Sequence, residues 1–253
     1  MFISFCRNTA RFIGIETNKT SHIERFISGM TAFIALLSVF YFSSLFLSLP
    51  DSFMVVSSIG ASAVLLFAVP HGAFSQPWPF FTGHFISACI GIACYQAFGA
   101  SLMVGAIAVG VSIIVMHYLR CLHPPGGSTA LSCVIGGESI HAMGYEFLLY
   151  PLLFNLLAML ILAFVINNSF YWRRYPSFLN TAVLHDKHEK HWFELEDLYG
   201  VLEKEDIFID ASAEELMHIY NASRERAKAR QKSFISRLPS KVRRLPIRIK
   251  RGG

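Results

Sequence analysis

The amino-acid sequence predicts an all-α membrane protein, in which four long transmembrane helices and two short, broken or half-helix segments form a 3+3 internal repeat. Three observations predict this fold class. Of the 253 residues, 53% are hydrophobic and only 15% are charged. Nearly all of the charged residues lie before Phe26 or after Asn168. A short motif of small residues also occurs twice, at Gly60 and at Gly127. Long segments without a polar face suit a bilayer and not a water-exposed helix.

The long apolar segments can each cross a membrane as a helix. They contain 18 to 24 residues, and about 20 residues span a hydrocarbon core of about 30 Å. Between residues 26 and 166 the only lysine or arginine is Arg120. Three acidic side chains occur there: Asp51, Glu138 and Glu146. The four segments are Phe26 to Leu49, Phe80 to Phe98, Ser101 to Tyr118 and Phe147 to Val165.

Two shorter apolar segments, Ser57 to Val69 and Pro124 to Ile135, carry the repeated motif. Gly60 and Gly127 are 67 residues apart, and the same offset aligns the segment that begins at Phe80 with the one that begins at Phe147. Segments this short do not cross a bilayer unaided. We expect half-helices or re-entrant segments, which are stable at membrane depth only where other helices or a water-filled cavity surround them.

Basic residues on both sides of the apolar region place both termini in the cytoplasm. They are Arg7, Arg11, Lys19 and Arg25 before the first span, and Arg173, Arg174 and Lys187 after the last one. The number of crossings is then even. It is four, with parallel halves, if the short segments re-enter, and six, with inverted halves, if they cross. We prefer the inverted arrangement, because it brings the N-termini of the two short helices to a common point from opposite sides.

These predictions divide the chain into three parts. Residues 1–25 form a cytoplasmic N-terminal segment, residues 26–167 form the transmembrane domain with halves of about 26–98 and 101–166, and residues 168–253 form a cytoplasmic helical and basic tail. Ser212 and Glu215 form a capping box for a helix from about Ala213 to Phe234. We expect the basic end of the tail to contact anionic membrane lipid. Nucleic acid is the alternative partner, which we set aside because the membrane is closer.

The run His123-Pro124-Pro125-Gly126-Gly127-Ser128-Thr129-Ala130-Leu131 resembles the signature of the HPP family of integral membrane proteins. The run from Ile59 to Ala68, followed by Pro70-His71, Gln76-Pro77 and Gly83-His84, is similar to the first conserved block of that family. The resemblance covers about residues 21–167. Some plant plastid and cyanobacterial members of the family are nitrite transporters, so the resemblance implies nitrite transport as a hypothesis. We do not expect the paired CBS domains that several members carry.

The second motif also has the chemistry of an anion site. Pro124 and Pro125 force an extended entry into a helix start, and Gly126 and Gly127 let the backbone approach a ligand closely. The free N–H groups and the dipole at a helix N-terminus stabilise an anion without a cationic side chain. The alternative is that the small residues serve only close helix packing. The candidate substrate-binding residues are Gly60, Ala61, Ser62, His123, Gly126, Gly127, Ser128 and Thr129.

Two histidines need separate interpretation, because an ionisable side chain within a membrane is a functional candidate by default. His123 precedes the broken segment and either couples a proton to anion entry by titrating near neutral pH or donates a structural hydrogen bond beside Pro124. The sequence leaves both roles open. His84 lies next to Gly83, which begins a small-residue series with Ser87 and Gly91, so we favour a packing role for it over gating.

The sequence thus predicts a membrane transporter or channel for a small solute, above all a monovalent inorganic anion such as nitrite. The competing hypothesis is a non-transporting membrane sensor or scaffold whose cytoplasmic tail binds a partner. We expect no enzyme activity, no catalytic residue and no cofactor, since no nucleophile, base and orienting residue occur at a workable spacing. We also expect no metal site, since the five cysteines lack a zinc-type spacing. The expected location is a bacterial inner membrane. The expected partners are membrane lipid and a small anion, and a homo-oligomer is compatible with the sequence.

Overall fold

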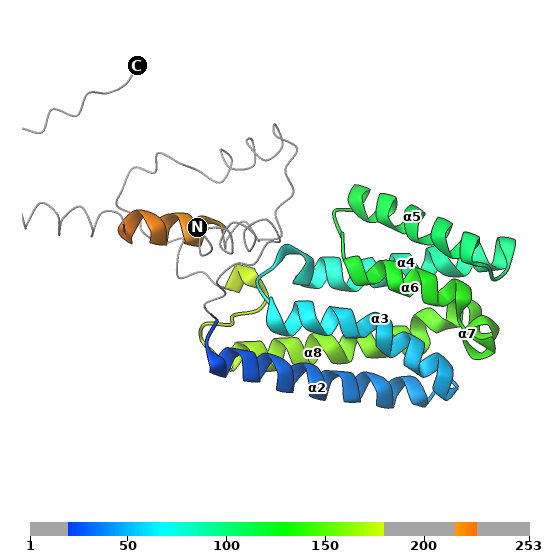
Figure 1. Cartoon of the computed structure of the whole chain (residues 1–253), viewed down its shortest axis with the longest axis horizontal. Helices are drawn as coiled ribbons and strands as arrows, with labels where there is room; N and C mark the ends of the chain where they lie inside the picture. The colour runs from blue at the N-terminus through cyan, green and yellow to red at the C-terminus, as the bar shows by residue number, and fades with distance from the viewer. Residues whose placement is uncertain (1–19, 180–215, 227–253) are drawn as a thin grey trace, which may run out of the picture.

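The computed structural model describes residues 20–179 and 216–226, and every regular element in them is a helix (Figure 1). Residues 216–226 form one helix, which falls within the predicted helix from 213 to 234, whose other residues lie outside the described part. The predicted cytoplasmic residues 1–19 and the basic tail also lie outside it. The larger described part contains, in order, α2 (His22–Ser44), α3 (Leu49–Ala68), η1 (Ala73–Ser75), α4 (Pro77–Phe98), α5 (Leu102–Tyr118), α6 (Pro124–Ile135), α7 (Glu138–Met143), η2 (Gly144–Leu148), η3 (Leu149–Leu153), α8 (Phe154–Asn168) and η4 (Ser177–Leu179).

Local sequence signals set the ends of these helices. Ser21 and Ser101 accept hydrogen bonds from backbone N–H groups in the first turns of α2 and α5, each at 3.1 Å. Such a serine cap contributes about 1 kcal/mol. Proline occupies the first turn of α3, α4 and α6, where the missing N–H costs nothing. α4 ends at Gly99, whose φ of 74° is accessible mainly to glycine.

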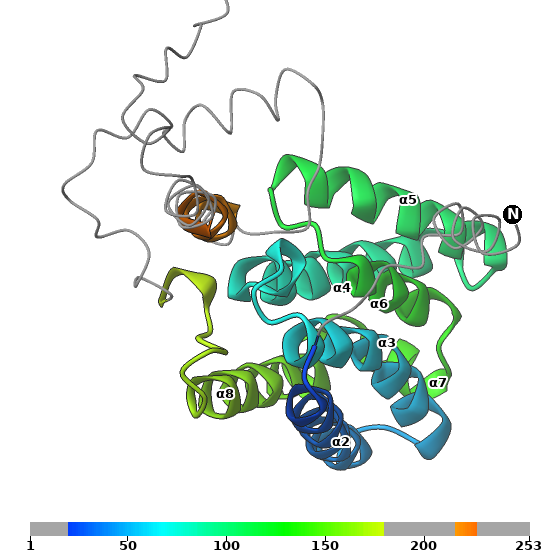
Figure 2. The same cartoon turned by 60° about the vertical axis from the view of Figure 1, so that its left-hand side comes forward.

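The helices form two groups of three (Figure 2). One group consists of α2, α3 and α8, the other of α4, α5 and α6, and the two meet where α3 contacts α6. α4, the third helix of the first predicted half, therefore packs with α5 and α6 of the second half. α8, the third helix of the second half, packs with α2 and α3 of the first half. Such an exchange is compatible with a 3+3 repeat, and the repeat and its inversion remain predictions.

Side-chain polarity runs opposite to that of a water-soluble bundle. Large apolar side chains point outward, for example Phe26 with 69%, Leu102 with 81% and Ile161 with 61% of its surface exposed. Small and polar side chains fill much of the interior, including Ser43, Ser87 and Asn155. This is the pattern of helices that associate within lipid, where burying apolar groups between helices gives no advantage. Four helical stretches are long and apolar enough to cross a membrane: α2, α3, α4 and the stretch 138–168.

The first short segment of the predicted fold is not short. Residues 57–68 belong to α3, a continuous helix of 20 residues, and Gly60 lies in its interior. The structural reason is that Pro50 stands at the helix start, where it is tolerated, and nothing between it and Ala68 breaks the helix. A single interior glycine costs only about 1 kcal/mol relative to alanine. The second short segment is short as predicted, because α6 has only 12 residues.

The last predicted span, from Phe147 to Val165, is interrupted. Gly144 has a φ of 51° and ends α7, and Tyr150 has non-helical backbone angles before Pro151. Regular helix α8 begins only at Phe154 and has 15 residues. The sequence signals for this break were Gly144 and Pro151, which the apolar count concealed. α5, predicted as a long span, has 17 residues, about 25 Å at 1.5 Å per residue.

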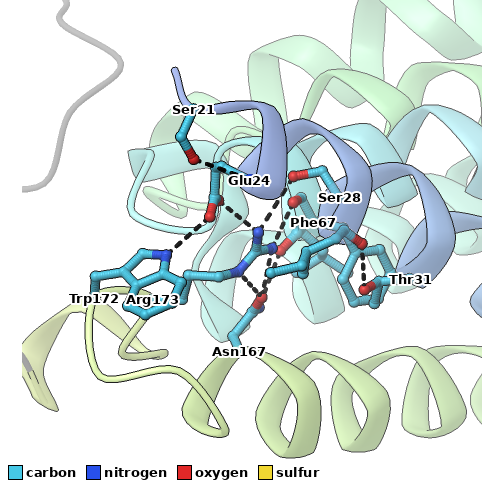
Figure 3. A network of polar contacts seen from close by, with 10 residues as sticks. Ser21, Glu24, Ser28, Thr31, Phe67, Asn167, Trp172 and Arg173 are labelled. Carbon is cyan, nitrogen blue, oxygen red and sulfur yellow. Dashed lines mark hydrogen bonds and ion pairs between the residues drawn. The ribbon is translucent and has the colours of Figure 1, made fainter. Parts of the chain in front are cut away.

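Arg173 ties the segment after α8 to the rest of the bundle (Figure 3). Its guanidinium is 1% exposed and donates to Glu24 on α2 at 2.5 Å, to the Phe67 carbonyl oxygen on α3 at 2.6 Å, and to Asn167 Oδ1 at 2.9 and 3.1 Å. Burial lowers the pKa of Arg173, while the neighbouring Glu24 carboxylate opposes that shift. Since arginine remains protonated in proteins, this contact is an ion pair that closes one end of the bundle.

The two ends of the bundle differ in charge. We call the end with segments 69–76, 119–123 and 169–179 the basic end, and the end with segments 45–48, 99–101 and 136–153 the acidic end (Figure 1). The basic end carries all the arginines of residues 20–179, which are Arg25, Arg120, Arg173 and Arg174, together with Glu24. The acidic end carries Asp51, Glu138 and Glu146.

Candidate functional site

Five buried side chains, from α3, from α4 and from the start of α6, form one hydrogen-bonded chain inside the bundle. Ser58 Oγ lies 2.6 Å from Thr129 Oγ1, which lies 2.6 Å from His84 Nδ1. His84 Nε2 lies 2.7 Å from Ser62 Oγ, which lies 2.8 Å from His123 Nε2. Each of the five residues exposes 3% of its surface or less. We call these five residues the histidine–hydroxyl chain.

The position of one hydrogen is fixed at the end of this chain. His123 Nδ1 lies 2.8 Å from the carbonyl oxygen of Phe74. A carbonyl oxygen can only accept, so Nδ1 must carry the hydrogen. A neutral imidazole has a single N–H, and therefore His123 Nε2 accepts a hydrogen bond from the Ser62 hydroxyl.

The other hydrogens follow from that one. Ser62 has a single hydroxyl hydrogen and gives it to His123, so it accepts from His84 Nε2. His84 Nδ1 then accepts from the Thr129 hydroxyl, which in turn accepts from Ser58. With both imidazoles neutral, all five hydrogen bonds point the same way, from Ser58 to the Phe74 carbonyl group.

The local sequence explains how these side chains meet. Ser58 and Ser62 are four residues apart on α3, so they share one face of that helix. Gly83 leaves space for the histidine of the next group, because a Cβ on it would lie 2.6 Å from His123 Cβ. Gly126 allows the same close approach, since its Cβ would lie 2.8 Å from the Gly83 carbonyl oxygen. The two glycines bring α4 and α6 together at the histidines.

An aromatic ring covers the histidine pair. The Phe80 ring centroid lies 5.4 Å from that of His84 and 5.5 Å from that of His123, both in edge-to-face geometry. The two imidazole centroids are 4.9 Å apart, and Phe80 is fully buried. The pair therefore lies in an apolar, low-dielectric environment, where hydrogen bonds are strong and an unpaired polar group is costly.

The structure brings three of the eight predicted site residues together: Ser62, His123 and Thr129. The other five do not take part in the chain. Gly126 and Gly127 are buried in helix contacts, and an added Cβ on Gly60 would meet only Leu36 on α2, at 3.7 Å. Ala61 and Ser128 are exposed on the outer surfaces of α3 and α6.

The pair of converging helix N-termini is not present. Gly60 lies inside α3, so its motif has no free N–H groups at a helix start. At the start of α6, Pro124 and Pro125 have no N–H, and the Gly126 N–H donates to the His123 carbonyl oxygen at 2.8 Å. In this geometry Ser62, His123 and Thr129 contribute side-chain hydrogen bonds. Gly126 and Gly127 contribute close helix packing.

The sequence analysis does not single out Ser58, and it expects a packing role for His84. Both ring nitrogens of His84 also belong to the histidine–hydroxyl chain, and the choice between a structural and a gating role stays a prediction. A signal for Ser58 was its spacing of four residues from Ser62, which places two hydroxyls on one face of a hydrophobic helix. Its partner Thr129 lies 71 residues away, and that contact has no local signal.

Cavities lie at both ends of the bundle. At the basic end a cavity of about 320 Å³ is lined by residues that include Phe74, Met116, His117 and Arg120. Phe74 thus connects this cavity to the histidine–hydroxyl chain. At the acidic end a cavity of about 520 Å³ is lined by residues that include Asp51 and Glu138. Within the described residues, no three His, Cys, Asp or Glu side chains cluster as a metal site requires.

The model of the transmembrane region of HPP proteins matches residues 17–176. That match covers most of the chain, and it includes the histidine–hydroxyl chain and Arg173. The chain belongs to the HPP family. The resemblance inferred from the HPP motif is therefore confirmed, and the protein is a membrane protein.

Two curated relatives are transmembrane proteins of Dictyostelium discoideum. One is 41% identical over 127 residues, which are 49% of this chain and 44% of the relative. The other is 34% identical over 132 residues, which are 51% of this chain and 42% of the relative. The chain thus matches less than half the length of these two relatives. No solved structure matches it.

Proposed function

We propose that this HPP protein transports a small solute across the membrane between α3, α4 and α6, and that the solute is a monovalent inorganic anion such as nitrite. The observation that carries the proposal is the histidine–hydroxyl chain, which is buried between the helices and runs from the middle of α3 to His123 at the start of α6. Ser58 and Ser62 lie near the middle of α3, far from either helix end. Polar and ionisable groups in a bilayer are costly, and where they occur they commonly mark substrate or ion pathways.

The chemistry of the site suits a small anion. Its side chains offer hydroxyl and imidazole hydrogen-bond donors, and no carboxylate takes part in the chain. The acidic residues of 20–179 lie at the two ends of the bundle. Arg120 lines the cavity that adjoins the chain at Phe74, so an anion that passes through the basic end meets the positive charge of this side chain.

The two cavities and the buried chain between them correspond to a closed conformation. Each cavity reaches one end of the bundle, and the five side chains between them are almost fully buried. Alternating access moves one group of helices against another around a fixed central site. In this protein the moving parts are the group α2, α3, α8 and the group α4, α5, α6, which meet at the site.

We assign the basic end to the cytoplasm, by the excess of arginine there. Both ends of the six-helix region, at α2 and α8, then face the cytoplasm, as expected for a bacterial inner-membrane protein. A sensor or scaffold is the rival function, because a fully satisfied polar core also fixes a unique helix packing.

Uptake by the purified chain in liposomes tests the proposal. We expect uptake of nitrite above that of protein-free liposomes, and competition by nitrate, formate or chloride but not by urea. Ser62→Ala should reduce uptake about ten-fold, since it removes a group that holds both histidines. Ser128→Ala, on the outer surface of α6, is the matched control and should have no effect. A folded protein that moves none of these solutes would favour the scaffold, and preferential uptake of urea would contradict an anion site.

A further inference from the structure

We propose that the histidine–hydroxyl chain carries a proton as a second substrate, which is stored on His123 while the anion is bound. The proposal rests on the transport function proposed above and adds the coupling ion to it. It follows from the single direction of the five hydrogen bonds, because a chain in which every group accepts from one neighbour and donates to the next can pass a proton along its length.

The transfer is balanced at every atom. A proton that reaches Ser58 Oγ lets Ser58 pass its own hydrogen to Thr129, and Thr129 passes its hydrogen to His84 Nδ1. His84 then passes the Nε2 hydrogen to Ser62. Each group breaks one O–H or N–H bond and forms another, and no electrons leave or enter the chain.

The last acceptor is His123. Ser62 passes its hydrogen to His123 Nε2, while Nδ1 keeps its hydrogen bond to the Phe74 carbonyl oxygen. The result is one imidazolium with both N–H groups hydrogen-bonded and the hydroxyls reversed. Release of the Nδ1 proton toward the 320 Å³ cavity beside Phe74 completes the passage. The passage leaves hydrogen on His84 Nδ1 and on His123 Nε2. Each imidazole returns to its original tautomer by giving that proton to water and taking one from water at its other nitrogen while the site is open, and the hydroxyls then rotate back.

The position of His123 explains why a proton and an anion would travel together. His123 is the residue immediately before α6 and so lies at the positive end of the helix dipole. An imidazolium alone is unfavourable there, whereas an anion is favourable. An anion beside His123 would offset both the charge of the imidazolium and that of the dipole, and in this apolar setting the attraction is weakly screened. Binding of either one therefore favours the other.

The titratable groups near the histidine–hydroxyl chain can be replaced one at a time. His84 on α4 belongs to the chain, and Cys121 precedes His123 by two residues. His117 and Arg120 line the cavity beside Phe74, on the side where the proton is released. At the other end, Asp51 is seven residues before Ser58 on α3, which is about 10 Å along the helix. The proton therefore enters at Ser58 when the acidic end opens to admit the anion.

Thr129 offers the sharpest test, because its hydroxyl is the donor to His84 Nδ1. Thr129→Val keeps the shape and removes the hydroxyl, whereas Thr129→Ser keeps the hydroxyl. Liposomes containing a pH-sensitive dye report proton entry alongside nitrite uptake, with protein-free liposomes as background. We expect nitrite to drive proton entry into the liposomes, and an imposed pH gradient to drive nitrite accumulation. Thr129→Val should reduce both about ten-fold, and Thr129→Ser should retain both.

The outcomes distinguish the two proposals. Nitrite uptake that does not depend on the pH gradient and is not accompanied by proton entry would contradict the proton relay. The proposed anion transport would still hold. If no anion is taken up, the proposed transport function is wrong. The relay is then tested by nitrogen NMR of the full chain in lipid, which shows which ring nitrogen of each histidine carries hydrogen. We expect hydrogen on Nδ1 of His123 and on Nε2 of His84 at neutral pH, with signals assigned by single replacements of each histidine. The opposite tautomer at either residue would contradict the direction of the chain and reject the relay.

Discussion

Asp51 Oδ1 accepts a 2.6 Å hydrogen bond from the backbone N–H of Gly137, a residue 86 positions later in the sequence. The same carboxylate accepts hydrogen bonds from the hydroxyls of Ser48 and Ser139. Asp51 stands in the first turn of α3, where the helix dipole also favours its charge. One side chain thus joins the start of α3 to the segment between α6 and α7, and closes the acidic end of the bundle.

Replacing Asp51 with asparagine should destabilise the protein. An amide keeps the shape but loses the charge that strengthens three hydrogen bonds, and its NH₂ group faces at least one donor. The expected cost is about 1–3 kcal/mol, measured as a lower unfolding temperature of the detergent-purified protein. Glu138→Gln removes a charge from the same cavity, where Glu138 is exposed, and should leave that temperature almost unchanged. Equal effects of the two variants would show that net charge, and not the Asp51 contacts, stabilises this end.

The opposite end gives a paired prediction with Arg173 and Arg174. Arg173→Lys keeps the charge but cannot reach Glu24, Asn167 and the Phe67 carbonyl oxygen at once, because an ammonium lacks the planar fork of donors. Loss of two such bonds should cost about 2 kcal/mol or more. Arg174 is exposed, and Arg174→Lys should cost nothing. The measurement is again thermal unfolding in detergent. An Arg173→Lys variant as stable as the wild type would mean that contacts other than those of Arg173 stabilise the basic end.

The helices were predictable where the sequence carries local signals. The prolines at the starts of α4 and α6 mark ends that composition also indicated. The start of α3 at Leu49 was missed, because apolar residues are frequent both before and after it. In a membrane protein, apolar content alone does not show where one helix ends and the next begins. Periodicity could not help, since lipid-facing and buried surfaces are both rich in apolar residues.

The site was only partly predictable for a different reason. Ser62, His123 and Thr129 were found because they belong to the repeated motif or to the HPP run. Their meeting depends on His84, which pairs with Ser62 across 22 residues and with Thr129 across 45. The first pairing joins α4 to α3 and the second joins α4 to α6, and only tertiary structure shows these contacts. The motif thus marked the region of the histidine–hydroxyl chain, but Gly60 lies inside α3 and not at a helix start, so the helix-terminus mechanism does not apply there.

Thiol labelling in cells tests the orientation of the bundle and the crossing of α8. Glu146 lies at the acidic end and Tyr171 at the basic end, and both are exposed. If the basic end is cytoplasmic, a cysteine introduced at Glu146 should react with an impermeant thiol reagent added outside, and one introduced at Tyr171 should react only after lysis. The background should lack the native cysteines. Labelling of both positions from outside would contradict six crossings, and labelling of Tyr171→Cys alone would reverse the orientation.

The contact between α4 and α6 at Gly126 gives the last prediction. A methyl group on Gly126 would lie 2.8 Å from the Gly83 carbonyl oxygen and 2.9 Å from Ser87 Oγ, so α6 must move away from α4. Overpacking of this kind costs about 1–3 kcal/mol. The displacement would also lengthen the bond between Thr129 and His84, so nitrite uptake should fall further than stability alone explains. Gly110→Ala is the matched control, because nothing lies within 4 Å of the Cβ that it adds to α5. Unfolding temperature and liposome uptake should both remain near wild type in that variant. If Gly126→Ala were fully active, the close approach of α4 and α6 would not be what positions the histidine–hydroxyl chain.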